Sequence, residues 1–300
     1  MQALKGSCYC RAAMKTSPSV GEFLRQWRQR RHLSQLELAS EAEVSSRHIS
    51  FVETGRSLPS REMLLHLSAI LDIPLRERNL LLLAGGYAPV FRESPFYDPS
   101  LQLARQAIEL VLAGQEPYPA LAFDRHWTLV KANKATMRLL CGVEAELLQA
   151  PVNVLRLALH PAGLAPRIVN LREWRAYALK RLRHQIAITG DPVLAQLLSE
   201  FSGYPETNGS HSIAAATDVQ YTGVVVRFQL FVEGTTLSFF STSTVFGTPV
   251  DITLSELAIE SYFPANQQTA DALWHLAHPE CKSTSSPLSS VGVTQGFRKK

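Results

Sequence analysis

The feature that most constrains the fold is a series of short, capped helices over residues 20–84. Apolar side chains recur there at helical spacing and predict five helices, at 21–31, 35–42, 46–53, 61–71 and 75–84. Ser34, followed three residues later by Glu37, is a capping box that sets the start of the second helix. Pro59 and Pro74 precede the last two helices, and Gly85 ends the series. We therefore predict an all-α five-helix domain.

The second and third helices have the layout of a helix-turn-helix. The third helix is short, so the polar residues Ser46, Arg47 and His48 at its N-terminus can enter a DNA major groove. Arg47 can pair bidentately with a guanine edge there. Gln35 begins the second helix, where backbone amides can hold a phosphate. The alternative is that residues 46–53 form only a surface helix of an α-helical bundle.

Composition permits a nucleic-acid partner without requiring one. The formal net charge is +4 over 300 residues, and the 46% hydrophobic content fits a folded protein of about two domains. The four cysteines are not spaced like a disulfide framework, which favours a reducing cytoplasm. No apolar run approaches the ~20 residues that cross a bilayer, and the N-terminus lacks the apolar core of a signal peptide. We expect a cytoplasmic protein without a membrane partner.

Changes in texture along the chain predict five segments. We expect a disordered arm at 1–18, the helix-turn-helix domain at 19–90, a connector at 91–105, a second folded domain at 106–279 and a disordered tail at 280–300. In the second domain, strands at 120–124 and 128–132 flank the turn Arg125-His126-Trp127, and Asn133 caps a helix at 134–140. This opening is similar to that of PAS-type sensor domains.

The rest of the second domain mixes helices and strands. Helical patterns occupy 151–159, 172–189, 193–201, 254–262 and 269–276. Strands at 224–232 and 236–246 form a hairpin around Glu233-Gly234. The predicted fold class is therefore multi-domain: an all-α five-helix helix-turn-helix domain followed by an α+β PAS-like domain. An antiparallel sheet with helices on one face leaves a pocket between them.

Residues 33–39 and 44–46 resemble the phage-repressor, or xenobiotic-response-element, class of helix-turn-helix. The longer runs 46–56, 59–63 and 74–79 resemble the MmyB-like transcriptional regulators, and so do 159–161, 164–170, Trp174, 190–192, 238–241 and 246–251. The resemblance covers residues 20–277. One departure is Glu43, which stands at a turn position usually filled by glycine and can be accommodated there at a conformational cost.

The resemblance places Gln35, Ser46, Arg47 and Phe51 at positions that face DNA. With their neighbours they make up the predicted DNA-binding set, which is Gln35, Ser45, Ser46, Arg47, His48, Phe51 and Arg56. Phe51 has two interpretations: it contacts a thymine methyl group, or it packs in the core. Because one short recognition helix reads only a few base pairs of double-stranded DNA, a homodimer is expected.

For the second domain, the resemblance implies a PAS-like site for ligands of the fatty-acid type. An acyl chain needs an apolar slot and its carboxylate needs donors. The candidate wall residues are Trp127, Trp174, Phe239, Phe240 and Phe246. The candidate donors are His160, Arg167, Asn170 and Arg181. The alternative is that the aromatic residues belong to the core, Arg167 to a surface pair and His160 to a loop.

Signatures of catalysis and of metal binding are weak. The sequence has no nucleophile elbow, phosphate-binding glycine loop or zinc-protease motif, so we expect no enzyme and no cofactor. Cys8 and Cys10 lack partners, and His275, His278 and Cys281 lack a clear fourth zinc ligand. The predicted function is a sequence-specific regulator that senses a small apolar or acyl ligand. The alternatives are a lipid-processing enzyme with a DNA-binding appendage and a regulator whose C-terminal domain binds a protein.

Overall fold

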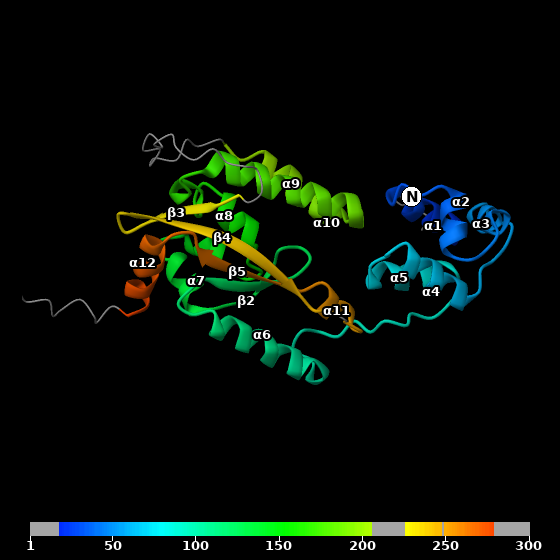
Figure 1. Ribbon diagram of the computed structural model, residues 1–300, viewed down its shortest axis with the longest axis horizontal. Coiled ribbons are helices and arrows are strands. Elements are labelled where there is room, and N and C mark those ends of the chain that lie inside the picture. Colours follow the sequence, from blue (N-terminus) through cyan, green and yellow to red (C-terminus); the bar gives the residue numbers. More distant parts are fainter. Residues whose placement is uncertain (1–17, 206–225, 248, 279–300) are drawn as a thin grey trace, which may run out of the picture.

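The computed structural model describes residues 18–205, 226–247 and 249–278. The predicted arm and tail lie almost entirely outside these ranges. The N-terminal part is the predicted bundle, shown at the right of Figure 1. Its helices are α1 (Val20–Arg30), α2 (Gln35–Glu41), α3 (Ser46–Glu53), α4 (Arg61–Ile70) and α5 (Leu75–Ala84).

Side-chain caps and a compact apolar core hold the bundle together. The predicted capping box at Ser34 is present, because the Ser34 amide donates to Glu37 at 2.6 Å and the Glu37 amide donates to the Ser34 hydroxyl at 3.1 Å. A second capping box, from Ser19 and Glu22, begins α1. Trp27 is the largest side chain of the core. On α2 the core takes Leu38, whereas Leu36 is 70% exposed on the outer side of the helix.

The turn between α2 and α3 has the geometry of the helix-turn-helix in spite of its unusual residue. Glu43 adopts a φ of 53°, in the left-handed region that glycine enters most easily. Its amide bonds the Ser40 carbonyl, and the next amide, of Val44, bonds the Ala39 carbonyl. The backbone bonds of the turn therefore form with glutamate in this position, as expected.

A connector fixed by one side chain leads out of the bundle. The Asn79 amide donates to the Phe91 carbonyl at 2.7 Å, and its oxygen accepts from the amides of Val90 and Phe91. The 3₁₀ turn η1 (Pro99–Leu101) and helix α6 (Gln102–Gly114) follow. Helix α6 buries Ile108 and Leu112.

The second domain is built on a five-stranded antiparallel sheet. Its strands are β1 (Ala120–Phe123), β2 (Leu129–Ala132), β3 (Phe228–Val232), β4 (Thr235–Val245) and β5 (Ala258–Pro264). Their order across the sheet is β2-β1-β5-β4-β3, so the last strand of the chain lies in the centre. The β3–β4 hairpin turns at Glu233 and Gly234, as predicted, and both have positive φ, at 46° and 83°.

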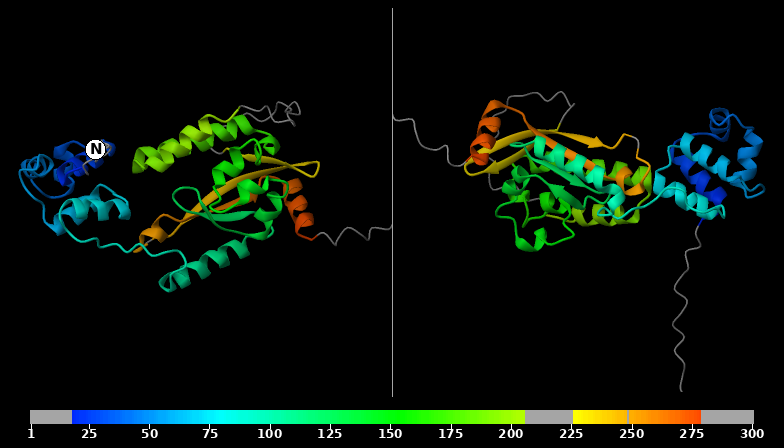
Figure 2. Two further views of the ribbon diagram at one scale, coloured as in Figure 1. Left: turned by 180° about the vertical axis from the view of Figure 1, so that it is seen from behind. Right: turned by 90° about the horizontal axis from the view of Figure 1, so that it is seen from below.

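Helices cover both faces of this sheet (Figures 1 and 2). One face packs against α7 (Lys134–Leu139), α8 (Val154–Leu159), α9 (Leu171–Thr189) and α10 (Pro192–Ser202), with the short turns η2 (Ala145–Leu148) and η3 (Ala165–Arg167) between them. On the other face, α6 packs on Ala120 and Ala122 of β1 and on Ile259 of β5. Helices α11 (Ile252–Ser255) and α12 (Gln267–Ala277) flank β5 in the sequence.

One predicted element is wrong. Residues 254–262 were expected to be helical, but α11 ends at Ser255 and β5 begins at Ala258. Glu260 and Tyr262 point to the face covered by α7, α8 and α9, and Ile259 points to the face that α6 covers. This alternation is a strand period. The central position of β5 overrides the local helix preference because each edge of the strand pairs with a neighbour.

Candidate DNA-binding surface and ligand cavity

Helix α3 presents its polar N-terminus to solvent. Ser45 is its N-cap, and the Ser45 hydroxyl accepts from the His48 amide at 3.1 Å. Ser46 and Arg47 are exposed, and His48 is half-buried. On its inner side, α3 buries Ile49 and Val52. The outer side of its first turn is therefore available to a groove.

Two arginine side chains lie close to the ring of Phe51 on this surface. The guanidinium carbon of Arg47 is 5.1 Å from the centre of the Phe51 ring, and that of Arg56 is 5.9 Å away. Both distances are within the range of cation–π contacts. Phe51 is half-buried, whereas Arg47 and Arg56 are exposed, so the ring and both cations lie at the surface of the domain. Its two interpretations, packing and base contact, are compatible in this geometry.

The Gln35 side chain is engaged inside the domain. Its amide donates to Glu53 at 2.8 Å. Glu53 in turn accepts two hydrogen bonds from Arg28, at 2.6 and 2.9 Å, and both of these side chains are buried. Gln35 therefore links the start of α2 to the end of α3, while its backbone lies in the first turn of α2.

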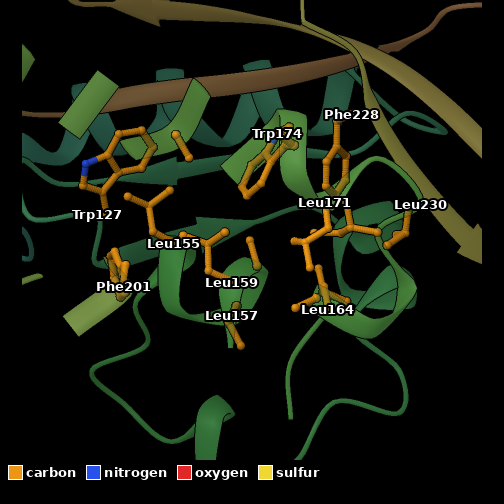
Figure 3. Packing of buried hydrophobic residues seen from close by; sticks show 14 of the residues in the cluster. Trp127, Leu155, Leu157, Leu159, Leu164, Leu171, Trp174, Phe201, Phe228 and Leu230 are labelled. Atoms are coloured by element: carbon orange, nitrogen blue, oxygen red, sulfur yellow. The ribbon is translucent and has the colours of Figure 1, made fainter. Parts of the chain in front are cut away.

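A mainly apolar cavity lies between the sheet and the helices α7, α8 and α9. The centre of a water molecule can occupy about 80 Å³ of this cavity. Figure 3 shows the buried hydrophobic residues around it, with Trp127 at one side, Trp174 and Phe228 at the other, and Leu155 between them. Apolar residues from all four sides line it: Leu121, Trp127, Leu129, Leu139, Leu140, Val154, Leu155, Leu157, Ala158, Leu164, Trp174, Ala178, Phe228, Leu230 and Phe239.

Three of the five predicted wall residues reach this cavity. Trp127, Trp174 and Phe239 line it. Phe240 is the neighbour of Phe239 in β4, so it points to the opposite face, where it stacks on Phe263 with ring centres 5.4 Å apart. Phe246 packs against the cluster beneath α6. Phe240 and Phe246 were predicted as wall residues because the sequence alone did not show which face of the sheet each strand position occupies.

Of the four predicted head-group donors, one lines the cavity. Arg181 lines the cavity, whereas His160, Arg167 and Asn170 do not. His160 accepts from the Ala162 amide, Arg167 donates to the carbonyls of Cys141 and Phe231, and Asn170 donates to the Arg227 carbonyl. These three side chains therefore hold backbone segments together in the described structure.

Arg181 belongs to a polar corner of the cavity, formed with Tyr177, Glu260 and Tyr262. Tyr177 and Arg181 are one turn apart on α9, and Glu260 and Tyr262 share one face of β5. Arg181 donates to Glu260 at 2.9 Å and to the Ser243 hydroxyl at 3.0 Å, and its guanidinium stacks over Trp127 at 4.6 Å. Ser241 also donates to Glu260, at 2.9 Å. The pattern of residues 254–262 predicted a helix, so nothing in the sequence indicated that Glu260 and Tyr262 share one face of a strand.

Burial raises the pKa of Tyr262 well above its ordinary value, and the negative charge of Glu260 adds to this effect. The phenol is therefore protonated at neutral pH. The Tyr262 ring packs against Phe228 and Phe239, and its hydroxyl forms no hydrogen bond with any described residue. A neutral hydroxyl donor thus remains available at the polar corner.

Charged side chains join the two domains at a junction cluster, which we define as Arg76, Glu93, Arg125, Asp191 and Glu256. Arg76 of α5 donates to Glu256 at 2.8 and 3.1 Å and to Glu93 at 2.8 Å. Arg125 lies 3.5 Å from both Asp191 and Glu256. His126 contacts Asp191 at 2.9 Å, and Arg30 of α1 donates to the Thr189 carbonyl at 3.4 Å.

The turn at Trp127 belongs to both the cavity and the junction. Trp127 has a φ of 64°, stacks on Phe123 and donates through its indole to Gln185 at 2.8 Å. Arg125 and His126, the two residues before it, hold Asp191 in the α9–α10 turn. A side chain in the cavity wall is thus two residues from an ion pair that reaches Glu256, the carboxylate held by Arg76.

His275, His278 and Cys281, which lack a clear fourth zinc ligand in the sequence, lie only partly within the described ranges. His278 stacks on Trp274 and contacts its carbonyl, and Cys281 lies outside the described residues, as do Cys8 and Cys10. Within the described part of the chain, no three potential metal ligands lie close enough together to hold an ion. Among its helices, none is both long and apolar enough to cross a bilayer.

Two family models match the chain. Residues 19–81 match a helix-turn-helix domain, and residues 104–276 match the MmyB-like transcription regulator ligand binding domain. The multiprotein-bridging factor 1 of Candida albicans is 35% identical over 69 residues, which are 23% of this chain and 46% of that protein. The chain thus matches less than half the length of this curated relative.

A solved structure of an RNA-binding light-oxygen-voltage receptor is 12% identical to this chain. The comparison covers 88% of this chain and 65% of the receptor, with a TM-score of 0.26. The ligand-binding-domain match spans more than half of the chain and includes the whole cavity. The chain belongs to the family of MmyB-like transcription regulators, with a helix-turn-helix domain ahead of a ligand binding domain.

Proposed function

We propose that this DNA-binding regulator reads a specific DNA sequence through α3 and changes its affinity for that sequence when an acyl-type chain occupies the cavity. The observation that carries the proposal is the position of Trp127, which lines the cavity and directly follows Arg125, a member of the junction cluster, and His126, which contacts Asp191 of that cluster. A ligand that moves the indole changes the support of Asp191 and Glu256, and hence of Arg76 in α5. The proposed place of action is the cytoplasm.

The lining of the cavity supports an apolar chain as the ligand. Side chains from the sheet and from three helices surround it, and apart from Thr136 they are aliphatic or aromatic except at one corner. The fatty-acid class implied by the family resemblance fits this slot. An internal cavity also favours a small molecule over the alternative of a protein partner, which would need a broad exposed apolar patch.

The DNA-binding half of the proposal is tested at Arg47. We expect Arg47→Ala to reduce affinity for the operator by about tenfold, because a bidentate arginine–guanine pair contributes ~1–3 kcal/mol of discrimination. The measurement is a gel shift with DNA from upstream of the protein's own gene, against random competitor. Arg172→Ala is the control, since Arg172 is exposed on α9, far from α3 in sequence and in fold.

Two results would contradict sequence-specific binding. Equal affinity of the unaltered protein for upstream and random DNA removes the claim altogether. An equal loss for both DNAs in Arg47→Ala makes Arg47 a phosphate contact, because phosphate contacts do not discriminate between sequences.

The sensing half is tested by the molecule that the protein carries. We expect mass spectrometry of gently extracted protein to find an intact acyl-chain compound. Hydrolysis of an added acyl thioester would instead support the alternative of a lipid-processing enzyme. The regulator architecture argues for sensing, because both matched domains have binding functions.

We also propose that the protein acts as a homodimer, since one short recognition helix reads only part of an operator. A row of exposed apolar side chains on α6, made by Leu103, Ala107, Leu110 and Val111, supports a second copy as the partner. The small Ala107 lets two such helices approach closely. We expect a dimer by light scattering and a monomer for Leu110→Glu, with Val193→Glu on α10 as the control. A monomeric parent protein would contradict this proposal.

A further inference from the structure

We infer that the cavity selects a chain-like ligand whose head group is an uncharged oxygen-bearing group, such as an amide, ester or alcohol, and rejects a free carboxylate. This inference rests on the proposed function, because it assigns the head group of the proposed acyl ligand. It narrows the fatty-acid expectation to the uncharged derivatives of that class.

Apart from Thr136, the polar side chains that line the cavity are gathered at one corner. Among the described residues that line the cavity, Arg181 and Glu260 carry charge, and they lie together with Tyr177 and Tyr262 at one corner. The remaining lining is apolar apart from Thr136, whose hydroxyl already donates to the Ala120 carbonyl at 2.9 Å. A ligand with one polar end therefore has one place for that end.

The two charges at this corner compensate each other. Arg181 would be an anion-binding residue if its charge were uncompensated, but Glu260 accepts from it at 2.9 Å. The Glu260 side chain is only 7% exposed, so little water screens its charge. A ligand carboxylate would bring a second anion beside Glu260 in a poorly solvated site, where like charges repel strongly. An uncharged head group brings no such repulsion.

Several hydrogen-bond donors at this corner remain unused within the described part of the chain. The hydroxyls of Tyr177 and Tyr262 form no hydrogen bonds with described residues, and Arg181 has donors beyond those given to Glu260 and Ser243. A carbonyl or hydroxyl oxygen can accept from these groups. In this mainly apolar setting a hydrogen bond to the ligand oxygen is stronger than the same bond in water.

A series of probes with one chain length tests this assignment on the full-length protein. The probes are decanamide, methyl decanoate, decanol, decanoate and decane, compared by calorimetry and by quenching of tryptophan fluorescence. At about pH 8 decanoate is ionised, so it reports the carboxylate. We expect decanamide and decanol to bind at least about tenfold more tightly than decanoate, which corresponds to ~1.4 kcal/mol.

Two variants separate charge from hydrogen bonding. Glu260→Gln leaves Arg181 uncompensated, and we expect it to raise the affinity for decanoate about tenfold while that for decanamide changes much less. Tyr262→Phe removes a hydroxyl only, and we expect it to weaken decanamide and leave decane unchanged. Glu109→Gln on the exposed side of α6 is the control. Tyr262→Phe keeps the test decisive if Glu260→Gln does not fold.

The outcomes distinguish this inference from the proposed function. Decanoate binding as tightly as decanamide to the unaltered protein, or a preference that Glu260→Gln leaves unchanged, overturns the head-group assignment and keeps the apolar chain. Failure of every probe, decane included, overturns the proposed acyl ligand itself.

Discussion

The ion pair between Arg28 and Glu53 shows how much of the DNA-binding domain depends on individual residues. Arg28 belongs to α1 and Glu53 to the last turn of α3, and Gln35 of α2 donates to the same carboxylate. Arg28 also donates to the Leu33 carbonyl at 2.7 Å. One buried carboxylate thus fixes three helices, and the hydrogen bond to Glu53 raises the pKa of Arg28 in spite of its burial.

Removing this carboxylate will destabilise the domain. We expect Glu53→Ala to lower the free energy of unfolding by about 3 kcal/mol, because it leaves the Arg28 charge buried without a partner. Urea denaturation followed by circular dichroism gives the value. Glu41→Ala, at an exposed position of α2, should change it by less than about 0.5 kcal/mol. Equal effects of the two substitutions would show that the pair contributes nothing of its own.

Residue patterns in the sequence predicted this domain well. Ser34, Glu37 and the turn around Glu43 set its helix boundaries through local hydrogen bonds, so those boundaries follow from neighbours in sequence. The partnership of Gln35 with Glu53 spans 18 residues, and no local rule gives it. For the same reason the corner formed by Arg181 and Glu260, which are 79 residues apart, was out of reach of sequence reasoning.

At the scale of elements, the two faces of β4 have different roles. Phe239 is fully buried at the cavity, and its neighbour Phe240 is 39% exposed on the opposite face. The sequence predicted the β3–β4 hairpin but not which phenylalanine faced inward. That choice depends on the register with β5, a strand that was assigned as a helix, so one error in an element led to errors about individual side chains.

These two phenylalanines make a matched pair for measurement. We expect Phe239→Ala to cost ~3–5 kcal/mol of stability, because it empties a packed position between Phe228 and Tyr262. Phe240→Ala should cost about 1 kcal/mol, the contribution of an exposed cross-strand stack with Phe263. Thermal unfolding of both variants compares them directly. Similar losses would mean that β4 does not have the register described.

At the scale of the whole molecule, the junction cluster links the domains through charges. Arg76 binds Glu256 and Glu93, and Glu256 also lies 3.5 Å from Arg125, which precedes the cavity residue Trp127 by two positions. These side chains are partly exposed, so each pair contributes little to stability. Their value lies in the orientation that they give α5.

Loss of Arg76 should therefore affect communication more than folding. We expect decanamide to change the operator affinity of the unaltered protein by about fivefold or more, within the usual range of coupling between sites. In Arg76→Ala this ratio should fall close to one, whereas Lys131→Ala, which removes an exposed pair with Glu109, should keep it. Gel shifts with and without the amide measure the ratio. A parent-like ratio in Arg76→Ala would exclude this route of communication.

The turn of Arg125, His126 and Trp127 also has a consequence for engineering. A biosensor with a new ligand preference would normally be made by replacing large wall residues, and Trp127 is the obvious first choice. Arg125 and His126, which precede Trp127, contact Asp191 of the junction cluster, however. Replacements at Trp127 should therefore change the DNA affinity of the ligand-free protein as well as the ligand specificity. Leu139 of α7 and Leu155 of α8 line the same cavity from helices without residues in the junction cluster. Libraries at those two positions should separate ligand choice from signal level.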